Sequence, residues 1–264
     1  MSIQKYFIIA NPEGKSWDLA KFIYERLKNK EPDFEINEVN IKKFKVGEDK
    51  PKIRNNVRRG LCFYIADSND NPNDWVLRTA LINQALRTSG AERIINVLPH
   101  IYYSRQDRKD ESRVPISAKL VADIISRDID HVITLDVHAP QIQGFYNIIL
   151  DSLPSLGTVV GYLKRYHPNI LKDDLVIVSP DAGGGKRAEA FANILKNPNL
   201  AIGHKTRVDK NNKKLNKHSK KEIERIIFPE DVVKDKNIFM IDDLGDSYGT
   251  FCESADALRE LGAK

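Results

Sequence analysis

Residues 237–252 read NIFMIDDLGDSYGTFC, and they predict a strand, a polar loop and the start of a helix. Four apolar residues predict a buried strand over 238–241, and the amphipathic pattern of 253–261 predicts a helix. The small polar loop between them offers outward-pointing N–H groups and hydroxyls, which suit a phosphate. Two carboxylates, Asp242 and Asp243, follow the strand. They cannot bind phosphate, but they suit ribose hydroxyls or a phosphate-bound Mg²⁺.

The composition is typical of a globular protein. The 264 residues are 41% hydrophobic and 30% charged, which is enough for one large or two modest domains. No apolar run approaches the roughly 20 residues of a membrane span, and the N-terminus has no signal-peptide pattern. Cys62 and Cys252 have no metal-ligand spacing and fit a reducing compartment. We therefore expect a cytoplasmic protein without a membrane partner.

The basic charge is concentrated in one segment. The net charge is +5, and residues 205–221 hold eight Lys or Arg and one Asp, so the rest of the chain carries −2. A general nucleic-acid-binding surface needs basic residues spread over a face or a groove. We therefore expect no nucleic-acid partner and ask instead what this one basic segment does.

Strands and helices are predicted to alternate. The expected strands are 4–11, 34–44, 61–66, 94–98, 132–135, 175–178 and 200–203, and the expected helices are 16–28, 73–88, 116–126, 158–166 and 186–195. This alternation predicts mostly parallel sheets with helices on both faces. We expect two α/β domains, over residues 1–150 and 151–264.

Two motifs of the first half follow predicted strands. Residues 98–117 read LPHIYYSRQDRKDESRVPIS, and the carboxyl end of a strand is where open α/β sheets bind ligands. Arg105 and Gln106 in this motif suit a polyphosphate or a nucleotide. Residues 133–145 read ITLDVHAPQIQGF. Asp136 and His138 point the same way if the strand continues through them, and such a His is a candidate metal or phosphate ligand.

Two motifs of the second half also follow strands. Residues 178–187 read VSPDAGGGKR, where the glycines allow close approach of a ligand and Asp181 can reach a hard cation. Residues 203–214 read GHKTRVDKNNKK and belong to the basic segment. They lack apolar periodicity, so we expect an irregular, mobile loop there.

These motifs resemble those of one family. Residues 237–252 are similar to the phosphoribosyl-diphosphate loop of type I phosphoribosyltransferases, and most similar to its form in ribose-phosphate diphosphokinases. The other four motifs resemble blocks of the same family, in the same order. The resemblance implies two phosphoribosyltransferase-like domains, each a mostly parallel sheet flanked by helices. It also implies transfer of the diphosphoryl group of Mg–ATP to the C1 hydroxyl of ribose 5-phosphate, with AMP as the second product.

The resemblance assigns roles residue by residue. It implies catalytic roles for Lys205 and Arg207. It implies ATP contacts for Arg105, Gln106, Asp107 and His138, and for Phe44, Gly47 and Glu48 of a neighbouring subunit. It implies ribose-phosphate binding by Asp242, Asp243, Asp246, Ser247, Tyr248, Gly249 and Thr250, and Mg²⁺ binding by Asp136, His138 and Asp181. A homo-oligomer, either a dimer or a hexamer, is implied as well.

The sequence departs from the family pattern at three places. Val46 replaces the family's Asp, and Tyr248 replaces a small residue. Family members usually continue with another strand and helices, so we expect a second domain that lacks this extension. Two alternatives stay open: the same chemistry on a larger ribose-phosphate acceptor such as ADP-ribose, or a catalytically silent regulatory homologue. A phosphoribosyltransferase proper is disfavoured, because Arg105 and Gln106 would have no role.

Overall fold

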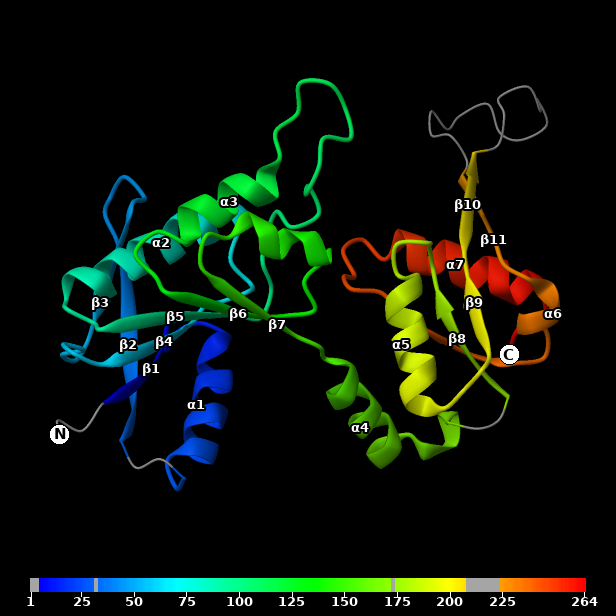
Figure 1. Cartoon of the computed structure of the whole chain (residues 1–264), viewed down its shortest axis with the longest axis horizontal. Coiled ribbons are helices and arrows are strands. Elements are labelled where there is room, and N and C mark those ends of the chain that lie inside the picture. Colours follow the sequence, from blue (N-terminus) through cyan, green and yellow to red (C-terminus); the bar gives the residue numbers. More distant parts are fainter. Residues whose placement is uncertain (1–4, 31–32, 172–173, 208–223) are drawn as a thin grey trace. The chain divides into compact units, whose positions relative to one another are not determined.

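The chain forms two compact units. The computed structural model describes residues 5–30, 33–171, 174–207 and 224–264, with side chains omitted at 206, 207, 224 and 225. The first unit ends at Pro154 and the second begins at Ser155 (Figure 1).

The first unit is built on a seven-stranded sheet. Its strands are β1 (Tyr6–Ala10), β2 (Phe34–Lys43), β3 (Asp49–Ile53), β4 (Leu61–Ile65), β5 (Arg93–Leu98), β6 (His131–Leu135) and β7 (Ile149–Leu153). The strand order is β3-β2-β1-β4-β5-β6-β7. Only the β2–β3 pair of this sheet is antiparallel. The carboxyl ends of the parallel strands therefore meet at one edge, where the ligand-binding loops of open α/β sheets lie.

Helices cover both faces of this sheet (Figure 1). They are α1 (Ser16–Leu27), α2 (Pro72–Thr88), α3 (Ser117–Ile125) and the 3₁₀ helix η1 (Pro140–Phe145). Consecutive residues of a strand point to opposite faces. Ile8 of β1 accordingly packs in the cluster that contains Ala20 of α1, whereas Ile9 packs in the larger cluster with Trp75 of α2 and Val121 of α3.

The second unit has a smaller parallel sheet and a two-stranded ribbon. The sheet has the order β12-β8-β9, with β8 (Leu175–Ser179), β9 (Leu200–Ile202) and β12 (Asn237–Met240). The ribbon pairs β10 (His204–Arg207) with β11 (Glu224–Ile227) in antiparallel register. The helices are α4 (Leu156–Tyr166), α5 (Gly185–Leu195), α6 (Glu230–Val233) and α7 (Gly249–Glu260), with the 3₁₀ helix η2 (Pro168–Ile170).

Strand β8 is the centre of the second unit's core, and all five of its residues are buried. Leu175 and Ile177 pack in one apolar cluster with Phe191 of α5. Val176 packs on the opposite face, in the cluster that contains Leu258 of α7. The second sheet is therefore also covered by helices on both faces.

Five strand predictions needed correction. Strands β3, β7 and β11 were not predicted, and β7 spans the position at which we expected the domain boundary while pairing with β6 of the first unit. Residues 204–207, expected to be irregular, form β10; the rest of that expected loop, 208–214, lies outside the described residues. Strand β12 is half-buried rather than buried, because within the described residues it pairs on one side only, with β8.

In the part of the chain that the structure describes, no helix combines the length and the apolar character needed to cross a bilayer.

Candidate active site

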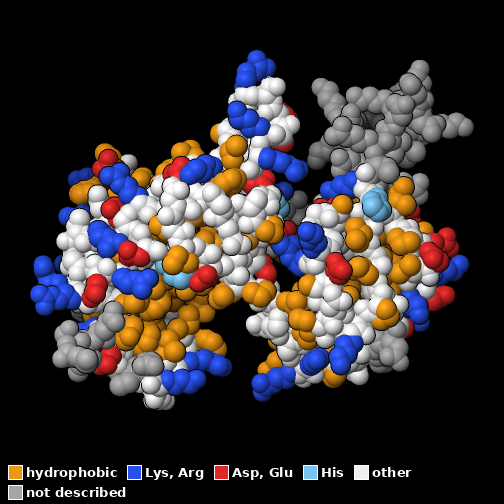
Figure 2. Space-filling view, in the orientation of Figure 1, with side chains coloured by type: hydrophobic (Ala, Val, Ile, Leu, Met, Phe, Trp, Pro, Cys, Tyr) orange, Lys and Arg blue, Asp and Glu red, His pale blue; other side chains and the backbone are white. Residues whose placement is uncertain are grey.

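The loop between β5 and α3 carries the first predicted ATP motif. Gln106 is fixed there, because its carbonyl accepts from Ala118 N at 3.1 Å and its Oε1 accepts from Ser117 Oγ at 2.7 Å. Both partners belong to the first turn of α3. Arg105 is exposed. Figure 2 shows Lys and Arg side chains gathered on this projecting loop, whose exposed residues include Arg108, Lys109 and Arg113. The loop thus offers several cationic groups near one anchored amide side chain.

The segment after β6 lies beside this loop. Gln141 Nε2 donates to Asp107 Oδ2 at 2.7 Å, which joins two motifs that are 34 residues apart in the sequence. Asp136 is half-buried, and His138 is exposed. The strand does not continue through them as we expected: β6 ends at Leu135, and Asp136 has φ +38°. Strand alternation therefore does not determine how the Asp136 and His138 side chains point.

The β2–β3 hairpin carries the third set of predicted ATP-binding residues. Residues 44–48 form its loop, which is closed by a hydrogen bond from Phe44 N to Glu48 O at 2.9 Å. Gly47 has φ +97°, a conformation that glycine adopts without strain. The Phe44 and Val46 side chains are 52% and 81% exposed, and Lys50 Nζ lies 5.5 Å from the centroid of the Phe44 ring. The hairpin tip therefore presents its side chains outward.

The glycine-rich turn after β8 is held by Asp181. Its Oδ1 accepts from Gly184 N at 3.1 Å, and its carbonyl accepts from Ser179 Oγ at 2.7 Å. A Cβ on Gly184 would lie 2.5 Å from Ser179 Oγ, so a larger residue there would displace the hydroxyl that bonds to the Asp181 carbonyl. Helix α5 starts at the next residue and directs Arg187 toward the end of β12, where Arg187 Nη1 lies 3.6 Å from Asp243 Oδ1.

The two carboxylates after β12 lie at the same edge of the sheet, because β12 and β8 are parallel neighbours. The pKa of the Asp242 carboxyl is raised to about 6, mainly by burial and also by the neighbouring carboxylates of Asp243 and Asp181. The Asp243 N–H, which donates to Asp242 Oδ1 at 2.8 Å, opposes this rise. Three carboxylates thus lie at one edge of the sheet, and the Arg187 guanidinium lies 3.6 Å from one of them, Asp243.

The predicted phosphate loop leads into the longest helix of the second unit. Residues 245–249 are exposed, and Gly249 is the first residue of α7, which has 12 residues. The Gly249 N–H points to Ser247 Oγ at a long 3.5 Å. Tyr248 precedes the helix with φ +58° and ψ +8°, in the left-handed region. Exposed N–H groups and hydroxyls at a helix N-terminus suit a dianionic phosphate.

The predicted catalytic residues lie on β10. Lys205 is exposed, and its backbone pairs with that of Ile226 in β11. The backbone of Arg207 pairs with that of Glu224, and the Arg207 side chain lies outside the described atoms. The pairing carries Lys205 and Arg207 away from the sheet along a ribbon, as Figure 1 shows for the yellow β10 arrow.

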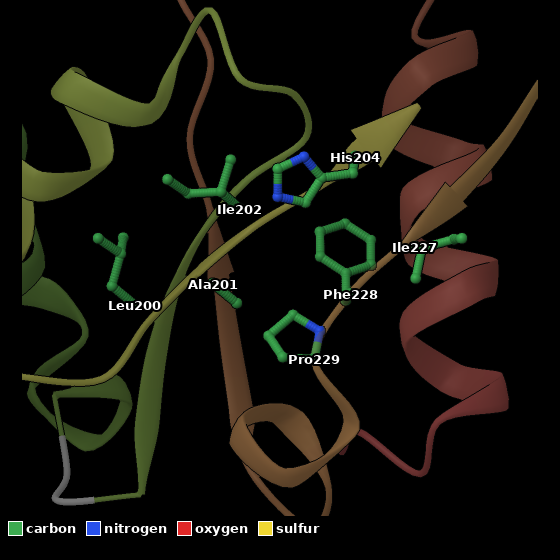
Figure 3. Close-up of a pocket in the computed structure, with 7 residues that line it drawn as sticks. All are labelled: Leu200, Ala201, Ile202, His204, Ile227, Phe228 and Pro229. Atoms are coloured by element: carbon green, nitrogen blue, oxygen red, sulfur yellow. The ribbon is translucent and has the colours of Figure 1, made fainter. Parts of the chain in front are cut away.

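A cavity in the second unit lies apart from the predicted site residues. It has a volume of about 430 Å³ and is lined by Leu200, Ala201, Ile202, His204, Ile227, Phe228 and Pro229 (Figure 3). None of the predicted site residues lines it. Its walls are apolar apart from His204, whereas the predicted substrates are polyanions.

The carboxylates have the chemistry that Mg²⁺ requires, although the described residues contain no cluster of three or more His, Cys, Asp or Glu that forms a complete metal site. Mg²⁺ is usually held by one or two carboxylates, waters and the substrate's phosphates. Asp181, Asp242 and Asp243 supply carboxylate oxygens at this edge, and the carboxylates of Asp243 and Asp181 help to raise the pKa of Asp242. Asp136 and His138 belong to the first unit and Asp181 to the second, so the three predicted ligands are divided between the units.

Sequence reasoning missed two residues that organise the site. Gln141 bonds to Asp107, and its signal was its place inside the 133–145 motif. Arg187 lies in the 178–187 motif, but its proximity to Asp243 could not be read from the sequence, since 56 positions separate them.

The chain is similar to known proteins over most of its length. Residues 12–127 match the family model of the N-terminal domain of ribose phosphate pyrophosphokinase. The chain is 38% identical over 248 residues to ribose-phosphate pyrophosphokinase 3 of Saccharomyces cerevisiae, which covers 93% of this chain and 71% of the relative. It is 39% identical over 230 residues to ribose-phosphate pyrophosphokinase A of Dictyostelium discoideum, with coverage of 86% and 68%.

A solved structure is similar as well. The crystal structure of phosphoribosylpyrophosphate synthetase from Mycobacterium smegmatis matches with a TM-score of 0.82 and 30% identity, over 99% of this chain and 78% of that chain. The match confirms the expected α/β fold. Because two curated relatives are more than a third identical and are covered over two thirds of their length, the chain belongs to the ribose-phosphate pyrophosphokinase family.

Proposed function

We propose that this chain transfers the diphosphoryl group of ATP to the C1 hydroxyl of ribose 5-phosphate, which gives 5-phosphoribosyl 1-diphosphate and AMP. One observation carries the proposal beyond family membership: the Asp242–Asp243 pair, the exposed loop 245–249 and the start of α7 stand in sequence at the carboxyl edge of the second sheet. This arrangement has donors for a sugar phosphate at one end and acceptors for its ring hydroxyls at the other.

The acceptor is bound by the second unit. The N–H groups and hydroxyls of residues 246–250 receive the 5-phosphate, since α7 adds the partial positive charge of its N-terminus. Asp242 and Asp243 accept hydrogen bonds from the ribose 2- and 3-hydroxyls. The C1 hydroxyl is then held in one position, which lowers the entropic part of the barrier.

The nucleotide is bound by the first unit. Gln106 is anchored by Ser117 and can contact ATP without reorganisation. Arg105 and the neighbouring cations supply charge for the phosphates. Phe44, Gly47 and Glu48 of a neighbouring copy supply the adenine contacts, because the hairpin tip is directed outward. This arrangement requires a homo-oligomer.

Transfer of a diphosphoryl group requires mainly positioning and charge stabilisation. The C1 oxygen attacks the β-phosphorus, the bond to the α-phosphate oxygen breaks, and the proton of the hydroxyl leaves to solvent or to a nearby base. Lys205 and Arg207 approach on the β10–β11 ribbon and stabilise the negative charge that develops at the β-phosphorus. Asp136 and His138 of the first unit and Asp181 of the second are the residues that would hold Mg²⁺, which would neutralise phosphate charge when bound.

An activity assay tests the proposal. The purified chain is incubated with Mg–ATP and ribose 5-phosphate, and the products are separated by anion-exchange chromatography. We expect AMP and phosphoribosyl diphosphate in equal amounts, and neither product when ribose 5-phosphate is omitted.

A parallel reaction contains ADP-ribose as the acceptor. AMP formation with ADP-ribose alone would favour the larger acceptor, and no AMP with either acceptor would refute the transferase activity. Asp243→Asn is the matched variant, since it removes one charge and keeps the side-chain size; we expect it to raise the KM for the acceptor.

A further inference from the structure

Tyr248 adopts a backbone conformation that bulky residues rarely take. Its φ of +58° and ψ of +8° lie in the left-handed region, where a residue with a side chain stores about 1 kcal/mol or more of strain. Such strain persists only where the surroundings hold it. The surrounding loop therefore holds the Tyr248 backbone in a conformation that it would not adopt by itself.

The Tyr248 ring lies against Gly245. A Cβ added at Gly245 would be 2.6 Å from Tyr248 Cε1, 2.8 Å from Cζ and 3.0 Å from Oη, and these are its three nearest atoms. Real Cβ atoms essentially never come within 3.0 Å of another heavy atom. A side chain at position 245 and the ring in its present place thus exclude each other.

The ring is not in the core. It is 61% exposed, and its aromatic neighbour Phe251 is 6.2 Å away between ring centroids, tilted by 57°. The area that Tyr248 removes from water is therefore small, and its burial adds little to the stability of the unit. What the ring does is span the loop, from the residue before α7 back to Gly245.

We propose that Tyr248 is a positioning residue whose ring, packed on Gly245, holds loop 245–249 in the conformation that receives the acceptor's 5-phosphate. The inference rests on the proposed function, because that function supplies the phosphate. The loop needs such a constraint, since residues 245–249 are all exposed and the Gly249 N–H···Ser247 Oγ contact is long at 3.5 Å. Glycine at position 245 leaves room for the ring in this place, and a larger residue would displace it.

The test is a double-mutant cycle with Gly245→Ala, Tyr248→Ala and the combined variant, measured as KM for ribose 5-phosphate and KM for ATP. Gly245→Ala displaces the ring, so we expect the KM for ribose 5-phosphate to rise about tenfold, with the KM for ATP within about threefold. The combined variant should have the same KM for ribose 5-phosphate as Tyr248→Ala alone, because the added methyl group has no ring to displace. The inference is refuted if the two substitutions raise this KM independently, so that their fold-changes multiply, or if Gly245→Ala leaves it unchanged.

Tyr248→Phe separates the ring from the hydroxyl. Two of the three nearest atoms are ring carbons, so we expect Tyr248→Phe to raise the KM for ribose 5-phosphate much less than Tyr248→Ala does; equal rises in the two variants would overturn the role of the ring. Tyr166→Ala is the control, because Tyr166 is also an exposed tyrosine, 57% accessible, but ends α4 away from the loop. It should leave both KM values unchanged.

A second readout keeps this test separate from that of the transferase activity. If the wild type makes no phosphoribosyl diphosphate, the proposed function fails, and the steric pair is then measured by thermal unfolding. We expect Gly245→Ala to lower Tm more in the wild-type background than in the Tyr248→Ala background. Equal Tm shifts in the two backgrounds would refute the contact between position 245 and the Tyr248 ring. If Gly245→Ala alone fails to fold while the combined variant folds, the pair is supported. If neither folds, a Tyr248→Ala variant with an unchanged KM or Tm overturns it.

Discussion

Arg78 Nε of helix α2 donates to Asp49 Oδ2 of strand β3 at 2.7 Å, and both side chains are only 11% exposed. The same guanidinium pairs with Asp70 in the loop that precedes α2. Asp49 directly follows the hairpin loop 44–48. Arg78 therefore fastens the base of the hairpin, whose tip we assign to adenine binding, to the body of the first unit.

Arg78→Ala should destabilise the protein and weaken ATP binding together. It takes the guanidinium away from Asp49, which is mostly buried and keeps a 3.6 Å ion pair with Lys43 Nζ, so we expect the free energy of unfolding to fall by about 2–4 kcal/mol. The looser hairpin should also raise the KM for ATP several-fold. We expect a smaller rise in Arg78→Lys, which keeps the positive charge. Urea unfolding and ATP titration measure both quantities.

Arg259→Ala is the control, because it removes an exposed ion pair with Asp256 and should lower the free energy of unfolding by under about 1 kcal/mol. Equal losses of unfolding free energy in the two variants would contradict the role of Arg78.

Lys205→Ala and Arg207→Ala should lower turnover far more than they weaken ATP binding. Their charges act on the transition state, and loss of one preorganised donor costs about 3–4 kcal/mol, or roughly 10²–10³ in rate. Single-turnover rates and the KM for ATP separate the two effects. Lys234→Ala is the control, since Lys234 is exposed and pairs locally with Glu230. A rate loss under about tenfold in both ribbon variants, roughly 1.4 kcal/mol, would make this segment a solvated spacer.

The parts of the fold that could be predicted are those with a local signal. Strand β8 is a continuous apolar run, and α2 begins at Pro72 after Asn71, whose side chain accepts from Asn73 N at 3.0 Å. Strand β3 reads DKPKI, with charges and a proline, so nothing in its own sequence separates it from a loop. It forms because β2 provides a partner. Strand β10 likewise depends on residues 224–227, which are too distant for periodicity to detect.

The candidate site could be predicted as chemistry but not as geometry. Residue types at strand ends pointed to phosphate, ribose and metal contacts. The contact of Gln141 with Asp107 and the approach of Arg187 to Asp243 depend on which strands are neighbours. The left-handed backbone of Tyr248 was also unpredictable, since a tyrosine there gives no sign of it.

The two cysteines should differ sharply in reactivity. Cys62 is fully buried in β4, and burial raises its pKa from 9.0 to about 12, whereas Cys252 is exposed. The thiolate is the reactive form. At pH 8 we therefore expect a chromogenic disulfide reagent to label one thiol per native chain and two in denaturant. Cys252→Ser should leave none in the native protein; rapid labelling of that variant would contradict the burial of Cys62.

The raised pKa of Cys62 also fixes the sign of a pH effect. Between about pH 9 and pH 12 the unfolded chain loses the Cys62 proton while the native chain keeps it, so ionisation favours unfolding as the pH rises. The stability that the un-ionised Cys62 thiol contributes is fully present below about pH 9 and is lost as the pH rises toward 12. Cys62→Ala lacks this titration, so its stability should fall less steeply over the same interval. Unfolding midpoints in urea, measured at pH 8 and pH 10.5, compare the two slopes.

Subunits should share their active sites. The hairpin tip exposes Phe44 and Val46, and we assign Phe44, Gly47 and Glu48 to a neighbour's adenine site. Phe44→Ala removes a hairpin contact, and Lys205→Ala removes a group that acts within its own chain. A mixture of the two inactive proteins, reassembled after mild dissociation, should regain activity, because a hybrid dimer pairs an intact hairpin with an intact Lys205. With random pairing about half of the dimers are hybrid, and the hairpin of the Lys205→Ala chain serves the site of the Phe44→Ala chain.

Sedimentation should show at least a dimer. An active monomer, or a mixture that stays inactive although sedimentation shows hybrids, would assign the hairpin to its own chain.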